Sequence, residues 1–307
     1  MNNKTLQRYF ILGDSWLFYK IYTGPKTTDT ILTEVIRPVA AELLEEHIID
    51  QWFFIRYGDP KHHLRVRFHC EKPDNIGAVI SRLLPYFKDY SEKELIWKVE
   101  ADTYKRELER YGNNTMELAE SLFFHDSEMI TAFLDMIEGD EGEELRWLFS
   151  LRAMDALLNS FQYTEEEKLT LMAQLKTGFG EEFGIGRPLK KQLDDKYRKQ
   201  RAKIEAFMIF ESEDNPDYAP ILQVLEQKKR CIGPVVKDVL KHLEEKTLER
   251  PLNDLIASYI HMLMNRLFKS RNRLHEMVCY DFLYRYYRSA IAKRKKTQVT
   301  SRTINSN

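Results

Sequence analysis

The stretch FFIRYGDPKHHLRVRF, residues 53–68, carries Arg56, Arg65 and Arg67 in two segments that have the composition of β-strands. Side chains alternate between the two faces of a strand, so Arg65 and Arg67 project from one face, with Cα atoms about 7 Å apart. A planar guanidinium group can hold a carboxylate or another oxyanion through two hydrogen bonds. The pattern therefore indicates either an anion-binding strand or an ordinary charged strand face in water.

A second charged cluster lies in TYKRELERYGN, residues 103–113. On a helical turn Glu107 and Arg110 are three residues apart and Arg106 and Arg110 are four apart, so we expect all three to share one face. Pairs of this kind are most often salt bridges in water that add little stability. By itself, this segment does not distinguish a solvated helix face from part of a site.

A histidine lies in the apolar segment SYIHMLMNRLF, residues 258–268. The expected core stripe consists of Ile256, Ile260, Leu263 and Leu267. His261 lies beside this stripe, and Asn265 follows one helical turn later. Such a histidine is commonly a core residue with its hydrogen bonds satisfied, but its ordinary pKa also suits proton transfer near neutral pH. Both interpretations stay open at this point.

Other chemical motifs are missing from the sequence. The loop GFGEEFGIG, residues 178–186, has the wrong glycine spacing for a dinucleotide fingerprint, and there is no G-x-S-x-G or Walker sequence. The three cysteines, Cys70, Cys231 and Cys279, form no C-x-x-C pair. We therefore expect no metal site, no disulfide framework and no cofactor, and a reducing cytoplasm is the expected compartment.

The overall composition is that of a globular protein. Of the 307 residues 43% are hydrophobic, which is enough for a substantial core. Lys and Arg number 47 against 48 Asp and Glu, so we expect no broad basic surface and no direct binding of nucleic acid. No window is apolar over the length that a membrane span requires, and the first residues lack the apolar core of a signal peptide.

The elements that must position these residues suggest an α+β fold. Strand-like patterns cover 8–22, 51–57, 62–70 and 95–103, and helical patterns cover 30–46 and 75–90. The turn residues Gly58-Asp59-Pro60-Lys61 join the second and third strand patterns as a hairpin. We therefore predict an N-terminal mixed sheet with flanking helices over residues 1–103.

From residue 104 onward helical periodicity dominates. One helix is expected to begin near Asn114, and Asp126-Ser127 is expected to cap the next. Further helical patterns cover 145–161, 165–174, 189–210, 218–245 and 251–287, with 178–188 as a loop. These observations predict a mainly helical part over 104–291, a single domain over 1–291, and a disordered basic and polar tail over 292–307.

Three motifs taken together resemble a known family. They are WFFIRYGDPKHHLRVRF, then YKRELERYG followed by MELAESLFFHDS, then HMLMNRLF. The chain resembles, from about residue 8 to 290, the C-terminal domain of class I lanthipeptide (lantibiotic) dehydratases, also called the thiopeptide-type bacteriocin biosynthesis domain. The resemblance implies a lyase that eliminates glutamate from glutamylated Ser or Thr of a ribosomally made precursor peptide, which leaves dehydroalanine or dehydrobutyrine.

The resemblance also implies partners and residue roles. The chain is similar to the stand-alone form, so a separate glutamylating protein that depends on glutamyl-tRNA is expected. Arg67, Glu107, Arg110 and His261 fall on the family's functional positions. The arginines would stabilise the enolate-like charge, the glutamate would orient an arginine or meet the free glutamyl amine, and the histidine would transfer a proton.

Three further residues are expected to bind substrate. Arg65 lies directly beside the proposed catalytic arginine, and Arg56 and Asn265 lie in the same motifs. Two other functions stay open. A related group of enzymes, the thiopeptide pyridine synthases, joins two dehydroalanines by a formal [4+2] cycloaddition. A non-catalytic partner subunit of a split dehydratase is the other alternative.

Overall fold

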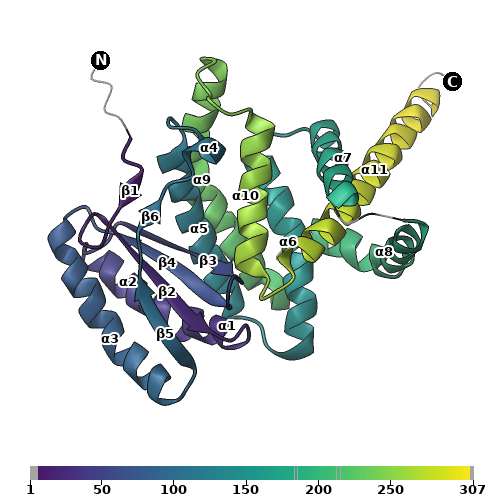
Figure 1. Cartoon of the computed structure of the whole chain (residues 1–307). Coiled ribbons are helices and arrows are strands. Elements are labelled where there is room, and N and C mark those ends of the chain that lie inside the picture. Colours follow the sequence, from purple (N-terminus) through teal and green to yellow (C-terminus); the bar gives the residue numbers. More distant parts are fainter. Residues whose placement is uncertain (1–5, 183, 185, 212, 215, 305–307) are drawn as a thin grey trace. The chain divides into compact units, whose positions relative to one another are not determined.

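The computed structural model describes residues 6–304 except 183, 185, 212 and 215 (Figure 1). The chain forms two compact units. The first unit consists of Met1–Gly142 and Gln223–Ser270, and the second consists of Glu143–Leu222 and Arg271–Asn307. All seven candidate site residues lie in the first unit. The single domain expected over 1–291 stays a prediction.

The first unit contains an antiparallel four-stranded sheet in the order β3-β4-β2-β5. These strands are β2 (Trp16–Thr23), β3 (Gln51–Tyr57), β4 (His63–His69) and β5 (Ile96–Ala101). Two short strands, β1 (Tyr9–Phe10) and β6 (Tyr104–Lys105), form a separate antiparallel pair. The predicted α+β class is confirmed, but the sheet is antiparallel rather than mixed, because all its neighbouring strands run in opposite directions.

One face of this sheet is covered by helices. Leu64, Val66 and Phe68 of β4 have 0% exposure on this face. The covering helical elements are α1 (Thr27–Ile31), a π-helical segment (Leu32–Ile36), α2 (Arg37–Glu45) and α3 (Ile76–Glu92). Figure 1 shows α2 and α3 on the same side of the strands. We call the opposite face, which carries Arg65 and Arg67, the arginine face.

Strand β3 lies at an edge of the sheet, but its outer side is covered by helices α5 (Met116–Leu134) and α10 (Leu252–Leu267). The Phe54 N–H donates to Ser127 Oγ of α5 at 3.3 Å. The Arg56 N–H donates to Asn265 Oδ1, and Asn265 Nδ2 donates back to the Arg56 carbonyl, both at 2.9 Å. These side chains satisfy backbone groups that would otherwise be open to another strand.

The interior of α5 corrects one prediction. Asp126 and Ser127 were expected to cap a new helix, but they lie in the middle of α5. Both side chains have partners there. Asp126 forms an ion pair with Lys228 at 2.5 Å, and Ser127 Oγ donates a hydrogen bond to the Phe123 carbonyl at 2.8 Å. Because these partners are supplied by the fold, the two residues do not need a helix end.

The remaining helices of the first unit are α4 (Leu108–Tyr111) and most of α9 (Ala219–Glu244). Helix α4 ends at Gly112, whose φ of 76° favours glycine. A Cβ atom at this position would also lie 3.1 Å from Glu249 Cβ. The next residue, Asn113, donates from its backbone N and from Nδ2 to Glu249 Oε2, both at 2.8 Å. This contact fixes the short helix that carries Arg110.

The second unit is helical in the part of the chain that the structure describes. It contains most of α6 (Gly139–Ser160), α7 (Glu165–Glu182), α8 (Arg187–Ile209) and α11 (Asn272–Ile304). Asp155 of α6 joins three of these helices, because its Oδ1 accepts from Lys168 Nζ of α7 and from Tyr287 Oη of α11, each at 2.8 Å. The polar network therefore fixes the interior of this unit.

Two predictions for the second unit are corrected. Helix α7 extends to Glu182, so it covers much of the loop expected over 178–188. Helix α11 extends to Ile304, where a disordered tail was expected, and residues 305–307 lie outside the described residues. The sequence AKRKKTQ, residues 292–298, lacks apolar periodicity, but Ala, Lys, Arg and Gln all favour the helical backbone.

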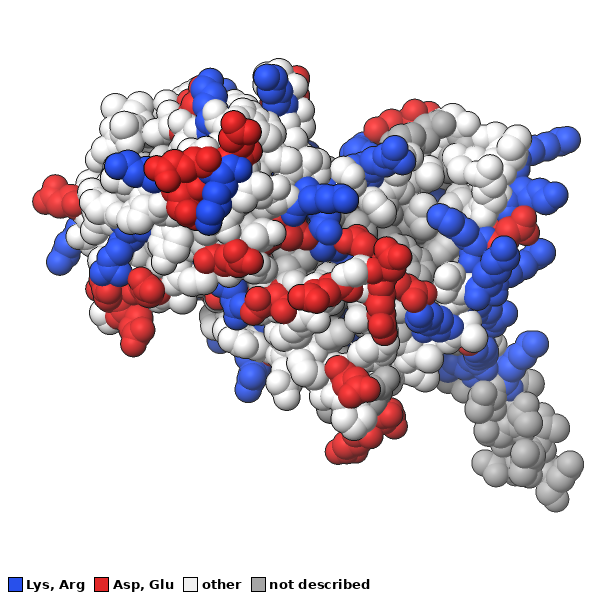
Figure 2. Space-filling model, turned by 90° about the horizontal axis from the view of Figure 1, so that it is seen from below, with Lys and Arg blue, Asp and Glu red and all other residues white. Residues whose placement is uncertain are grey.

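Charged side chains of both signs lie on the face of the molecule that Figure 2 shows. Figure 2 shows Lys and Arg together with Asp and Glu on the visible face. Among the described residues, no helix combines the length and the apolar character that crossing a membrane would require.

Candidate active site

The Arg67 guanidinium occupies the middle of the arginine face, among three aromatic rings. Its Cζ atom lies 4.3 Å from the centre of the Phe18 ring, 4.6 Å from that of Tyr104 and 5.1 Å from that of Phe53. The register explains two of these contacts, because Phe18 and Phe53 are the cross-strand partners of Arg67. The rings hold the cation through their negative faces.

Arg67 is a buried cation without a carboxylate partner. Its exposure is 7%, and among the described residues Nε has no hydrogen-bond partner and no carboxylate lies within ion-pair distance. Burial lowers the pKa of Arg67 to about 10, although the charges of Glu107 and Glu120 act in the opposite direction. The side chain therefore keeps its charge at neutral pH and can attract an anion.

Arg65 lies two residues before Arg67 on the same face, as the strand alternation predicts. Its Cζ atom stacks on the Tyr57 ring at 3.5 Å, and Nε donates to His63 Nε2 at 3.1 Å. His63 Nδ1 is 2.8 Å from the Lys61 carbonyl, so a neutral ring with its proton on Nδ1 satisfies both contacts. Arg65 is thus half-exposed and held in a fixed orientation beside Arg67.

The environment of His63 predicts a pH dependence of stability. Burial lowers the pKa of His63, although its hydrogen bond to the Lys61 carbonyl acts in the opposite direction. The unfolded chain therefore binds a proton near pH 6.5, whereas the folded protein does not, so stability is lost as the pH falls below that value. One such group can lower the free energy of unfolding by at most about 1.4 kcal/mol for each pH unit.

This effect can be measured with His63→Gln. We expect urea unfolding between pH 7.5 and 5.5 to show a smaller loss of free energy in the variant than in the wild type. Burial also lowers the pKa of His125 and His275, so part of the loss remains in the variant. Equal losses in both proteins would show that the folded state protonates His63 as easily as the unfolded chain.

A buried network holds the Tyr104 ring over Arg67. Glu120 has 0% exposure and binds Arg106 with both oxygens, Nε to Oε1 at 2.8 Å and Nη2 to Oε2 at 2.6 Å. Tyr104 Oη donates to the same Oε1 at 2.7 Å. The two-pronged ion pair is specific to arginine, and it fixes β6 against α5.

The pair Glu107 and Arg110 lies on the exposed side of this network. Arg110 Nη1 donates to Glu107 Oε2 at 3.3 Å, and the side chains are 42% and 64% exposed. Arg106 does not share their face, which corrects the helical spacing argument. It precedes α4 and follows strand β6, so its side chain is buried while that of Arg110 is in water.

Helix α10 positions His261 and Asn265. The helix contacts α4, because the Tyr259 and Tyr111 rings stack at 5.9 Å with an angle of 10° between their planes. It is also fixed to strand β3 through the Asn265 amide. His261 is half-buried and lies one turn before Asn265. The two contacts fix the orientation of the helix that carries the histidine.

Arg56 does not lie on the arginine face. Its neighbours Phe53 and Tyr57 contact Arg67 and Arg65, whereas Arg56 alternates to the other side of β3. Its Nη2 binds Asp29 Oδ1 at 2.6 Å, and Nε donates to the carbonyl of Arg266 at 2.8 Å. Arg56 and Asn265 therefore join β3 to its covering helices, and we do not propose either as a substrate ligand.

Sequence reasoning missed Arg266. This side chain has 0% exposure and lies on the same face of α10 as Tyr259 and Leu263. A signal was available, because Arg266 follows Leu263 by three residues and Tyr259 by seven, which places it on the apolar stripe of the helix. An arginine on that stripe must be buried.

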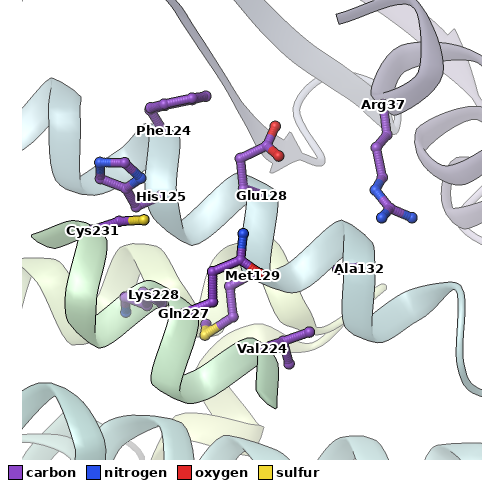
Figure 3. A pocket seen from close by; sticks show the side chains of 10 residues that line it. All are labelled: Arg37, Phe124, His125, Glu128, Met129, Ala132, Val224, Gln227, Lys228 and Cys231. Carbon is purple, nitrogen blue, oxygen red and sulfur yellow. The ribbon is translucent and has the colours of Figure 1, made fainter. Parts of the chain in front are cut away.

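A separate cavity of about 320 Å³ lies between α5 and α9 (Figure 3). Its lining includes Arg37, His125, Glu128 and Cys231, and none of the seven candidate residues. Figure 3 shows His125 next to Cys231, while Arg37 lies on the opposite side of the cavity. Burial raises the pKa of Glu128, although its hydrogen bond from Trp52 Nε1 at 2.6 Å acts in the opposite direction.

No three His, Cys, Asp or Glu residues in the described part of the chain lie close enough together to hold a metal ion.

Two curated proteins are similar in sequence to this chain. Subtilin biosynthesis protein SpaB of Bacillus subtilis is 28% identical over 280 residues, which cover 88% of this chain and 26% of SpaB. Nisin biosynthesis protein NisB of Lactococcus lactis subsp. lactis is 27% identical over 126 residues, which cover 41% of this chain and 12% of NisB. The chain thus spans at most about a quarter of the length of these relatives.

Three solved structures have a similar fold. The tRNA dependent lantibiotic dehydratase MibB from Microbispora sp. 107891 aligns with a TM-score of 0.70 and 20% identity, over 92% of this chain and 29% of MibB. TsrL aligns with a TM-score of 0.63 and 13% identity, over 89% of this chain and 94% of the TsrL chain. The pyridine synthase TbtD from thiomuracin biosynthesis aligns with a TM-score of 0.56 and 14% identity, over 90% of this chain and 97% of the TbtD chain.

The family comparison covers most of the chain. Residues 16–287 match the model of the family described as lantibiotic biosynthesis dehydratase C-term. This segment contains β4, which carries Arg67, and helices α4 and α10, which carry Arg110 and His261. The chain therefore belongs to the lantibiotic biosynthesis dehydratase C-terminal family.

Proposed function

We propose that this protein is a carbon–oxygen lyase that eliminates glutamate from glutamylated Ser or Thr residues of a precursor peptide. The observation that carries the proposal is the buried, unpaired guanidinium of Arg67, held by three aromatic rings at the centre of the arginine face. Elimination develops negative charge at the substrate, and such a preorganised cation stabilises that charge.

The proposed reaction breaks two bonds and forms a double bond. A base removes the Cα proton, the C–H electron pair forms the Cα=Cβ bond, and the Cβ–O bond breaks with its electrons on the departing carboxylate of glutamate. The products are one dehydroamino acid and one glutamate, so no oxidant or reductant is needed. Arg67 stabilises the enolate-like charge next to the Cα atom.

Three other residues have supporting roles in the proposal. Arg65 lies beside Arg67 and offers a second cation for the leaving carboxylate. The pair of Glu107 and Arg110 binds the polar groups of the glutamyl moiety from its exposed position. His261 transfers a proton, either from Cα or to the departing glutamate, because an imidazole ring can accept or donate a proton.

The relatives support this reaction class. SpaB and NisB are biosynthesis proteins of subtilin and nisin, and MibB is a tRNA dependent lantibiotic dehydratase. MibB is tRNA dependent and this chain covers 29% of it, and we propose a glutamyl-tRNA-dependent glutamylating protein as the partner that supplies the glutamylated peptide. The precursor peptide and this glutamylating protein are the proposed partners, and the cytoplasm is the proposed compartment.

Cycloaddition is the second candidate. The alignment with the pyridine synthase TbtD covers 97% of that protein, so the same fold also occurs in an enzyme of a different reaction class. A similarity of this degree concerns the fold alone. We favour elimination because the matching family model is that of lantibiotic biosynthesis dehydratases and the relative with 28% identity is a subtilin biosynthesis protein.

The test uses the purified protein and a chemically glutamylated Ser/Thr peptide, without tRNA, ATP or added metal. The proposal expects a loss of glutamate and a dehydroamino acid in the mass spectrum, and a much lower rate for His261→Ala. Arg82→Ala is the matched control, because Arg82 is an exposed arginine that pairs with Glu42 and Glu46 on the other side of the sheet. An unchanged ester, together with conversion of a peptide that carries two dehydroalanines, would favour cycloaddition instead.

A further inference from the structure

Arg266 is a second buried cation, and its hydrogen-bonding capacity is unused. Its Nε, Nη1 and Nη2 have no hydrogen-bond partner among the described residues, although the side chain has 0% exposure. Its Cζ atom lies 4.6 Å from the centre of the Phe123 ring and 6.0 Å from that of Phe53. Buried arginines normally use most of their five donors.

Asp126 is the carboxylate that faces Arg266, and the two side chains form an ion pair without a hydrogen bond. Asp126 Oδ2 is 3.8 Å from Arg266 Nη1, which is too long for a hydrogen bond. The other oxygen of Asp126 pairs with Lys228 Nζ at 2.5 Å, and Lys228 is itself 7% exposed. One buried carboxylate therefore faces two buried cations.

Arg67 adds a third positive charge to the same interior. The Phe53 ring lies beside both guanidinium groups, 5.1 Å from Arg67 Cζ and 6.0 Å from Arg266 Cζ. Burial lowers the pKa of Arg266 to about 10, and the charge of Arg67 acts in the same direction while Asp126 opposes it. Tyr111 Oη is also buried, and Arg110 is the polar side chain beside it.

Positive charge exceeds negative charge among these buried side chains. Cations buried without partners are costly, and an apolar side chain at position 266 would avoid that cost. Arg106 is a buried arginine with a structural role, and both carboxylate oxygens of Glu120 accept hydrogen bonds from it. Arg67 and Arg266 lack such a partner, so their donors are available to a ligand.

We propose that Arg266 and Tyr111 form a carboxylate-binding site behind Arg67, and that this site takes the free side-chain carboxylate of the glutamyl group. The identity of the occupant rests on the proposed function. A glutamyl ester has two negative centres in the reaction, the departing carboxylate and the free one. Two buried cations beside one ring match these two centres, and Arg266 thereby makes the protein specific for glutamate.

The first experiment measures specificity. Glutamyl and glutaminyl esters of the same peptide differ only in the charge of the acyl side chain. We expect the wild type to prefer the glutamyl ester in kcat/KM by about 10²–10³-fold, because a site built for a charged group rejects the neutral analogue. Arg266→Met is expected to reduce this preference to below about tenfold. A variant that keeps the preference would overturn the proposal.

The second experiment measures binding without catalysis. L-Glutamate at constant ionic strength, set with sodium chloride, is expected to raise the thermal midpoint of the wild type but not that of Arg266→Met. In the absence of glutamate the variant is expected to melt at the same temperature or higher, because a buried charge without a hydrogen bond has been removed. Arg106→Met is the matched control and is expected to melt lower, because it leaves Glu120 unpaired.

The outcomes separate this inference from the proposed function. If the wild type cleaves neither ester but L-glutamate still raises its midpoint through Arg266, the carboxylate site stands and elimination fails. If the wild type eliminates both acyl groups equally, elimination stands and the carboxylate site fails. A lower midpoint of Arg266→Met with no effect of L-glutamate on either protein would make Arg266 a structural cation.

Discussion

Arg67→Lys is expected to slow glutamate elimination by about 10²–10³-fold, which is the usual effect of removing one preorganised charge donor. Lysine keeps the positive charge, but it lacks the flat guanidinium group that lies among Phe18, Phe53 and Tyr104. The ammonium group is also more strongly hydrated, so it is less suited to this buried position. The rate is measured by mass spectrometry on a glutamylated peptide under single-turnover conditions.

The control for this prediction is Arg82→Lys, which changes an arginine on the exposed surface. The thermal midpoints of both variants should be recorded, because a rate lost through unfolding would have a different meaning. A folded Arg67→Lys protein with a rate within twofold of the wild type would remove Arg67 from the proposed mechanism.

Glu120→Gln is expected to lower the free energy of unfolding by about 3–5 kcal/mol. Burial alone would lower the pKa of Arg106, but its hydrogen bonds and ion pair with Glu120 raise it, so the carboxylate is what keeps this cation stable. The variant leaves Arg106 charged and buried without a buried counter-charge. Urea unfolding measures the difference.

The chain provides a matched control in Glu117→Gln. Glu117 also faces Arg106, at 3.5 Å, but its side chain is 68% exposed. An exposed pair of this kind contributes less than about 1 kcal/mol. Similar losses in the two variants would mean that burial does not determine the strength of the Arg106 ion pair, and the account of how Tyr104 is held would be wrong.

The strand pattern made the arginine face predictable. Alternation correctly placed Leu64, Val66 and Phe68 in the core, and Arg65 and Arg67 on the other face. These predictions succeeded because the side-chain period of a strand is a local property of the sequence. The partners of Arg67 were not predictable in this way, because Phe18 and Tyr104 reach it from distant segments.

Long-range pairing explains the errors. Helical spacing put Arg106 and Arg110 on one face, but residues 104–105 pair with Tyr9 and Phe10 as a strand, which turns Arg106 inward. Likewise, Asp126 resembled a helix cap until Lys228 supplied its partner from α9. In both cases the residue satisfies its charge with a partner that is remote in sequence, and no local pattern contains this information.

The first unit is assembled from two separated segments of the chain, and this order has a consequence for its synthesis. The Arg56 N–H cannot form its hydrogen bond with Asn265 until the ribosome has added Asn265, and residues 143–222 are made before that point. At about 5–20 residues per second, this delay is roughly 10–40 seconds. During that time the part of β3 that α10 covers stays open in the nascent chain, and an open strand edge can pair with another chain.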